Sequence, residues 1–291
     1  RTRSIPIIIE DDAGAITLSG KVSKGLVSNA EVKLFSVDGY ITDFLSPRQI
    51  VEPGYVDATG TYTFTLLPAI DFAELLLYKI EGDGADMVCD APQGCGQTGF
   101  GQTFEVKDLD LRAYLPVPSL GTTQTVNINI LTSLVERSAK NLADERFEGA
   151  NPEYVQRGRE EVSGVFGLPD QDFTKVPFVD VTRPITSTDE NAIRAAMIAG
   201  GVLGAAFSHS DPDNSDDYLE ELDEFIEAFG DGKAACRDSP AQTTASIEDV
   251  MVYARDLANI NGSTATRAFF SARLAGIRNG SIRCPFLPRS N

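Results

Sequence analysis

The chain has no tryptophan and only one histidine among its 291 residues. Basic side chains are also scarce, since 25 Lys and Arg face 43 Asp and Glu and leave a net charge of −18. Nucleic acids and anionic membranes attract proteins through clustered basic side chains, so neither is an expected partner. No apolar run approaches the roughly 20 residues of a transmembrane helix.

Signatures of catalysis are equally sparse. The lone His209 follows an apolar helical pattern, where a histidine usually interacts with the last helix carbonyls. No Gly-x-Ser-x-Gly elbow occurs. Sugar-processing clefts use aromatic platforms, which a chain without tryptophan supplies poorly. We therefore expect no enzyme, and we keep a hydrolase with dispersed carboxylates as an alternative because any acidic chain contains carboxylate pairs.

The four cysteines divide into two pairs. Cys89 and Cys95 are six positions apart around a Pro- and Gly-containing loop, which a disulfide can close. That leaves Cys236 and Cys284, which would pin the C-terminal tail to the end of a helix. The alternatives are four free thiols or a metal site, but no CxxC spacing exists and no Cys lies near the histidine. Two disulfides predict an oxidising, extracellular compartment.

Residues 94–99 read Gly-Cys-Gly-Gln-Thr-Gly and match the dinucleotide-binding fingerprint letter for letter. That motif needs a strand before it and a helix starting at it. Here strand patterns follow the motif, and one variable position is a cysteine. The context therefore favours a glycine-rich disulfide hairpin over a nucleotide site.

The N-terminal half alternates between apolar and polar residues. Three runs show the pattern, namely Ile16–Val22, Ala30–Val37 and Gly60–Leu66. Period-two alternation bounded by turn residues is typical of half-buried antiparallel strands. Further strands are expected at Glu74–Ile80, Thr103–Val106 and Leu111–Val117. The pattern predicts an antiparallel β-sandwich, Ig-like or transthyretin-type, over residues 15–118.

The remainder, residues 119–291, has helical spacing. The expected helices are Val126–Leu142, Pro152–Phe166, Ser187–Phe207, Asp217–Phe229, Ile247–Asn259 and one from Ser263 or Thr264 to Ile277. Within the first stretch, Thr132 or Ser133 would start the regular helix. Asn151 and Ser187 are the expected caps of the second and third, the latter with Glu190 in a capping box. The third is small and apolar all round, which predicts burial among close neighbours. We expect a helical bundle, and hence a multidomain β plus α chain whose two domains each have their own core.

An acidic segment precedes the fourth helix. Asp211, Asp213 and Ser215 have the alternate spacing of a calcium loop. The next position is Asp216 rather than Gly, however, and the twelfth is Leu222 rather than Glu. The pattern favours a helix start, with acidic side chains near the positive end of the helix. A Ca²⁺ site remains the alternative, and Ca²⁺ is the only cofactor that the sequence suggests.

Residues 1–14 form a separate element. Ile5, Ile7 and Ile9 share one strand face, Ile8 and Pro6 lie on the other, and residues 11–14 read as a hinge. The strand can pair within its own β-domain, stay disordered, or complete a neighbour's sandwich by strand addition. A head-to-tail contact of the last kind does not close on itself and yields a filament.

The β-domain pattern resembles a known module type. At Gly20–Val22, Ala30–Leu34 and Gly60–Phe64 it resembles the carboxypeptidase-regulatory-like, transthyretin-type modules of secreted bacterial proteins. With the cysteine loop, Val126–Leu134 and Val179–Thr182, the chain is similar to bacterial surface proteins and lipoproteins that join such a module to a helical domain. The resemblance implies export and a non-enzymatic role, and it carries over no catalytic residue.

The sequence therefore predicts a structural or adhesive protein of a bacterial cell surface. It would self-assemble through the N-terminal strand, with itself or another surface protein as partner. The alternative is a monomeric, secreted or lipid-anchored module that binds a ligand or glycan.

Overall fold

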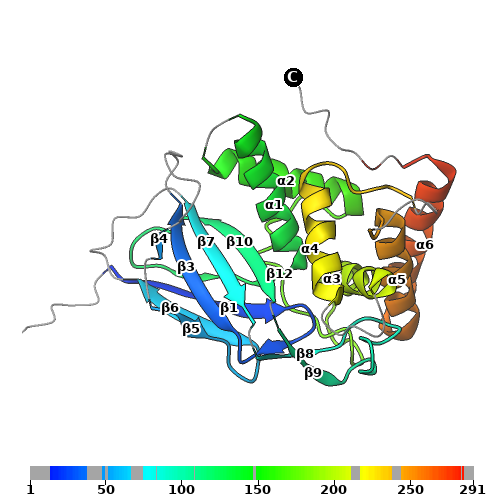
Figure 1. Cartoon of the computed structure of the whole chain (residues 1–291), viewed down its shortest axis with the longest axis horizontal. Helices are drawn as coiled ribbons and strands as arrows, with labels where there is room; N and C mark the ends of the chain where they lie inside the picture. Colours follow the sequence, from blue (N-terminus) through cyan, green and yellow to red (C-terminus); the bar gives the residue numbers. More distant parts are fainter. Residues whose placement is uncertain are drawn as a thin grey trace, which may run out of the picture.

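The structure, a computed structural model, describes residues 14–37, 48–49, 52–66, 75–82, 84–107, 109–146, 149–210, 217–237, 244–282 and 284. Strands occupy the N-terminal half of this part of the chain, and six helices follow them (Figure 1). The expected mixture of a β-rich first half and a helical second half is confirmed. The N-terminal strand proposed at Ile5–Ile9 lies outside the described residues.

The strands form several small sheets. Their bounds are β1 (Ile16–Ser23), β2 (Val27–Ser28), β3 (Glu31–Val37), β4 (Arg48–Gln49), β5 (Gly54–Tyr55), β6 (Thr61–Leu66), β7 (Leu75–Glu81), β8 (Ala85–Val88), β9 (Thr103–Val106), β10 (Asp110–Pro116), β11 (Thr123–Thr125) and β12 (Ile128–Asn129). One sheet centres on β1, a second has the order β10-β7-β3-β4, and a third has the order β2-β8-β9. The three alternating runs of the sequence are β1, β3 and β6, and each buries every second residue.

The β1 sheet departs from the antiparallel expectation. β6 pairs with β1 in antiparallel register, whereas β11 and β12 pair with it in parallel. Both parallel strands lie within residues 119–129, so sheet residues continue beyond the boundary expected at Pro118. The sequence did not predict β11 and β12, because they are only two or three residues long and are too short to show a periodic pattern.

Six helices make up the second half of the described chain. They are α1 (Ile130–Glu145), α2 (Pro152–Phe166), α3 (Glu190–His209), α4 (Asp217–Gly230), α5 (Ile247–Asn261) and α6 (Thr264–Asn279). The α2 prediction is confirmed at both ends. The Asn151 side chain accepts the Tyr154 N–H, and Gly167 ends the helix in the left-handed conformation with φ 70°.

Two helix starts differ from the expected ones. α1 begins at Ile130, ahead of the expected start at Thr132 or Ser133, because Asn129 caps it reciprocally with Thr132. α3 is capped by Asp189 rather than Ser187. The Asp189 carboxylate accepts the N–H groups of residues 191 and 192 at 3.0 and 3.1 Å. A charged acceptor outcompetes a hydroxyl for the same free N–H groups.

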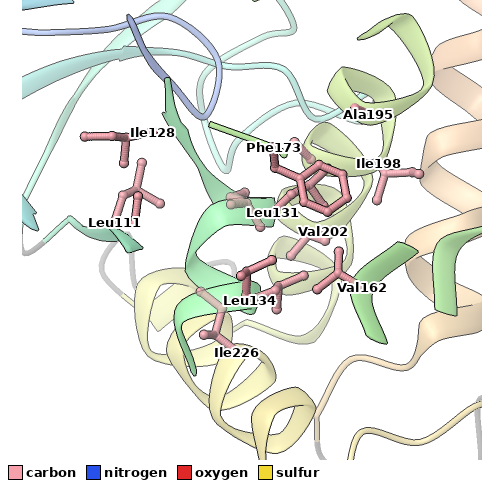
Figure 2. Packing of buried hydrophobic residues seen from close by; sticks show 14 of the residues in the cluster. Leu111, Ile128, Leu131, Leu134, Val162, Phe173, Ala195, Ile198, Val202 and Ile226 are labelled. Carbon is pink, nitrogen blue, oxygen red and sulfur yellow. The ribbon is translucent and has the colours of Figure 1, made fainter. Parts of the chain in front are cut away.

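Buried residues of both halves form one continuous core, not the two separate cores expected. Helix α1 lies at its centre. Figure 2 shows Leu131 and Leu134 of α1 within the cluster that also holds Val162 of α2 and Ile226 of α4. The β-rich part and the helices therefore stabilise each other through shared apolar contacts.

Most residues of helix α3 are buried, as its composition predicts. A Cβ added at Gly201 would meet the Val250 carbonyl oxygen of α5 at 2.5 Å, so the close helix approach depends on glycine. Of the described helices, α3 alone is long and apolar enough to cross a bilayer, yet 72% of its apolar window is buried inside the protein. Burial of this kind is typical of a core helix.

Candidate functional site

Both predicted cysteine pairs lie within disulfide distance, with Cα atoms 5.8 Å apart for Cys89–Cys95 and 5.5 Å for Cys236–Cys284. The first pair closes a loop that docks on helix α3, where the Gln93 side chain donates a hydrogen bond of 2.7 Å to the Gly204 carbonyl. The two bonds fit an oxidising compartment.

The glycine motif, residues 94–99, begins at the end of this first disulfide loop. Cys95 and Thr98 exchange backbone hydrogen bonds of 2.8 and 3.0 Å, and Gly94 and Gly96 have positive φ. Strand β9 follows the loop, and no helix starts at it. A dinucleotide would need the N–H groups of a helix start for its phosphates, so the hairpin interpretation is confirmed.

His209 contacts Asp249 of α5, with Nε2 3.4 Å from Oδ2, and not the last carbonyls of its helix as expected. The same carboxylate oxygen accepts the Ser246 hydroxyl at 2.7 Å. A catalytic triad needs the histidine between serine and aspartate. Here the aspartate stands between them, and the fully buried Ser246 caps α5, so this group stabilises a helix start.

The candidate calcium ligands Asp211, Asp213 and Ser215 lie outside the described residues. Helix α4 begins directly after them at Asp217, as the helix-start interpretation expects. Within the described ranges, no three acidic, His or Cys side chains are grouped to hold a metal ion.

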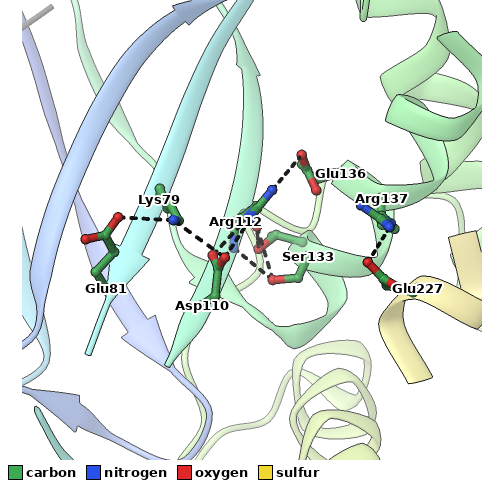
Figure 3. A network of polar contacts seen from close by, with 9 residues as sticks. Lys79, Glu81, Asp110, Arg112, Ser133, Glu136, Arg137 and Glu227 are labelled. Atoms are coloured by element: carbon green, nitrogen blue, oxygen red, sulfur yellow. Dashed lines mark hydrogen bonds and ion pairs between the residues drawn. The ribbon is translucent and has the colours of Figure 1, made fainter. Parts of the chain in front are cut away.

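An ordered network of charge crosses from the β10-β7-β3 sheet to helix α1 (Figure 3). Lys79 lies 3.1 Å from Glu81 and 3.7 Å from Asp110. Arg112 binds Asp110 with two nitrogens, at 3.0 and 2.5 Å, and lies 4.0 Å from Glu136 of α1. We call these five residues the paired network, because every member has a partner of opposite charge.

Electrostatics in the paired network follow from burial. Glu136 is only 3% exposed, and burial raises the pKa of its carboxyl. Hydrogen bonding to Asp110 raises the pKa of Arg112. Asp223 and Glu227 of α4 line a pocket together with residues of the paired network. Its volume is about 440 Å³, including the part that is open to solvent.

A second group of charge at the same junction is unpaired. Lys24 follows β1, is 1% exposed, and makes no hydrogen bond or ion pair among the described residues. Burial lowers its pKa to about 7, although Asp223 and Asp90 act to raise it. The ammonium nitrogen lies 5.5 Å from the ring centre of Tyr218.

Asp90 is the second member of this unpaired group. It is 3% exposed, and its Oδ2 accepts the Gly25 N–H at 2.7 Å. Its Oδ1 is buried without a hydrogen-bond partner in the described structure, and burial raises the pKa of the carboxyl to about 6. Asp223, whose pKa is also raised to about 6, stands at the solvent-exposed side of the group.

Sequence reasoning missed all of these charged residues. Arg112 and Lys79 lie within apolar strands, and Lys24 lies in a short turn, so none belongs to a motif. The one available signal was Asp90, which directly follows a cysteine in a loop expected to fold back. Their grouping depends on how sheets and helices pack, which sequence spacing does not encode.

The outer edge of strand β6 is a candidate interaction surface. The Val22 N–H donates to the Gly60 carbonyl at 2.9 Å, which fixes the hydrogen-bonded positions of the β1–β6 pair. Bonding alternates along an antiparallel pair, so the backbone groups of Thr61, Thr63 and Thr65 point away from β1. Thr61 confirms this, because its N–H and carbonyl both bind Asp57 at 2.9 Å.

Thr63 and Thr65 have no such neighbour among the described residues. β6 pairs there with β1 alone, and both threonine side chains are exposed. These threonines alternate along β6 with Tyr62, Phe64 and Leu66, whose side chains are buried on the opposite face. An open edge beside a buried apolar row is a template for another strand.

Comparison with known proteins gives no relative, since no family model and no curated protein matches this chain. The resemblance to secreted transthyretin-type modules therefore stays a prediction from residues.

Proposed function

We propose that this protein is a non-enzymatic structural or adhesive subunit of a bacterial surface, which assembles by adding residues 1–14 of one copy to strand β6 of the next. The open edge at Thr63 and Thr65 carries the proposal. It offers two N–H and two carbonyl groups to an incoming strand. The two disulfides fit the oxidising compartment that such a protein would occupy.

We further propose that the β-rich part is a sandwich of the transthyretin type. Tyr62 of β6 and Tyr78 of β7 belong to different sheets, and their ring centres are 6.2 Å apart. The two inner faces therefore meet in one buried layer, as the sheets of a sandwich do. In such a layer, β6 is an edge whose inner side chains an added strand would cover.

The donor segment has the pattern that this edge needs. Ile5, Ile7 and Ile9 alternate, as do the buried Tyr62 and Phe64 of the acceptor. In the register that turns the three isoleucines inward, Ile8 faces the acceptor backbone and can exchange both hydrogen bonds. Pro6 has no N–H, so it would only accept.

The position of β1 favours donation to another copy. At Ile16–Ser19, β1 has β6 on one side and at Thr17–Ser19 it has β11 on the other. The preceding segment can reach an edge of its own sheet only by reversing direction. Continuing outward leads it to another molecule, and the resulting head-to-tail contact extends into a filament.

Negative-stain microscopy and light scattering of the purified chain test the proposal. We expect filaments from the wild type, and only monomers after deletion of residues 1–14. Thr63→Pro removes the outward N–H of the acceptor edge without touching the β1 pairing, so it should also abolish filaments. Thr63→Val keeps that N–H and is the matched control.

A mixing experiment separates the two surfaces. The deletion variant and Thr63→Pro each retain one intact half of the contact, so together they should form dimers that neither forms alone. Monodisperse wild-type particles, or filaments that survive both changes, would rule out the strand-addition mechanism.

A further inference from the structure

A cavity lies where the β-rich part meets helix α3. It measures about 520 Å³, counted with the part open to solvent. Its apolar lining includes Leu131, Phe173 and four alanines of α3, at positions 192, 195, 196 and 199. The small residues of α3 thus have two uses, since its glycines admit close neighbours while these alanines leave space.

The cavity is held open by a fixed wall. This wall is the crossover of residues 173–182, which runs between α2 and α3. Asn127 binds one end, with its N–H on the Thr174 carbonyl at 2.6 Å and its side chain on the Val176 carbonyl at 2.8 Å. Asn261 binds the other end at the Val181 carbonyl, at 2.8 Å. A wall pinned at both ends makes a preformed site.

The charged residues that line the cavity, Asp90 and Asp180, are both acidic. Asp180 is occupied, because it accepts the N–H and hydroxyl of Thr182 at 2.9 and 2.6 Å and lies 3.3 Å from Arg183. Asp90 is not, because its buried Oδ1 has no hydrogen-bond partner in the described structure. The cavity therefore borders one buried carboxylate with an unused acceptor.

We propose that this cavity binds a small alkylammonium ion, with its nitrogen at Asp90 and its carbon chain along the alanine face of α3. A protonated amine supplies the N–H donor that Asp90 lacks, and such charge-assisted bonds are strong. The alanines and Phe173 suit the methylene groups. An anion would be repelled by the two carboxylates, and a neutral alcohol would bring no positive charge to Asp90.

Lys24 does not already fill this role. It is not among the residues that line the cavity. Its ammonium group lies at the Tyr218 ring, and it forms no ion pair within 4.0 Å among the described residues. Within the described structure, the buried Oδ1 of Asp90 thus has no hydrogen-bond partner in Lys24.

Calorimetric titration of the full chain at pH 7.5 with n-pentylamine, n-pentanol and pentanoate tests the proposal. We expect saturable binding of the amine alone. Asp90→Asn should weaken it at least tenfold, whereas Asp256→Asn removes an equal charge from the exposed surface of α5 and should leave it unchanged. Ala196→Leu fills the cavity without altering Asp90, so it should also abolish binding and serves if Asp90→Asn does not fold.

The other outcomes are equally clear. Equal binding of pentanol and pentylamine, or equal effects of the two Asp→Asn changes, would overturn the proposal. A lysine with blocked termini distinguishes the source of the ligand. If it binds like the free amine, a lysine side chain of a partner fits the cavity, and if only the free amine binds, a small diffusible amine does.

Discussion

The junction between sheets and helices holds two groups of buried charge that are built differently. In the paired network, Arg112 joins Asp110 and faces Glu136, so each charge has a partner. In the unpaired group, Lys24 and Asp90 are both almost fully buried, yet among the described residues Lys24 has no ion pair and one oxygen of Asp90 has no hydrogen-bond partner. Asp223 connects the two groups, because it acts on the charge of Lys24 and borders the pocket of the paired network.

This difference assigns a structural role to the paired network and a ligand-binding role to the unpaired group. A paired buried charge is costly to break but offers nothing to a ligand. An unpaired one costs stability in the free protein and gains from any partner of the right charge. The unpaired group also lies against the amine cavity, through Asp90. The comparison therefore predicts opposite effects for substitutions in the two groups.

The largest effect is expected in the paired network. Arg112→Met leaves Glu136 without its ion-pair partner and Asp110 with Lys79 alone, and we expect the free energy of unfolding to fall by about 2–3 kcal/mol. That is below the ~3–5 kcal/mol of a fully buried broken pair, because Arg112 is 31% exposed. Urea unfolding at pH 7 measures it.

Arg157→Met is the matched control. Arg157 pairs with Glu153 on the surface of α2, where such pairs contribute about 1 kcal/mol or less. Equal losses for the two variants would mean that the paired network behaves as an ordinary surface cluster.

The unpaired group should respond in the opposite direction. Lys24→Met removes a buried ammonium and keeps most of the side-chain volume, so we expect a gain of about 1–2 kcal/mol at pH 6.5. Replacement of buried charge by apolar residues is often stabilising. Urea unfolding measures this change as well. A loss of stability would show that Lys24 is held by Asp90, Asp223 and Tyr218 after all.

The fold followed from the sequence where period and caps were strong. Asn151, Pro152 and Gly167 fixed both ends of α2, and the alternating runs fixed β1, β3 and β6. Strands β11 and β12 could not be predicted from the sequence, because two or three residues show no periodic pattern. The charged groups at the junction could not be predicted for another reason. The roles of Lys24, Asp90 and Arg112 depend on their burial and on the residues packed around them.

The last prediction concerns the pH dependence of the free energy of unfolding, which should change by about 1 kcal/mol per pH unit. The folded-state pKa of Lys24 is lowered from 10.5 to about 7, so between these values the unfolded chain binds more protons and stability rises with pH. The pKa of Asp90 is raised from 3.8 to about 6, so in that window the folded chain binds more protons and stability falls as pH rises. Asp223 adds less, because water screens it.

The unpaired group should therefore give a stability minimum between about pH 6 and 7. Unfolding curves from pH 4 to 10 measure it. Lys24→Met should remove the alkaline rise, and Asp90→Asn should remove the acidic fall. Arg112→Met should lower the whole curve and leave the minimum in place. A minimum that shifts with Arg112 and ignores Lys24 would mean that the two groups titrate as one, because Asp223 couples them, and the distinction between paired and unpaired charge would then fail.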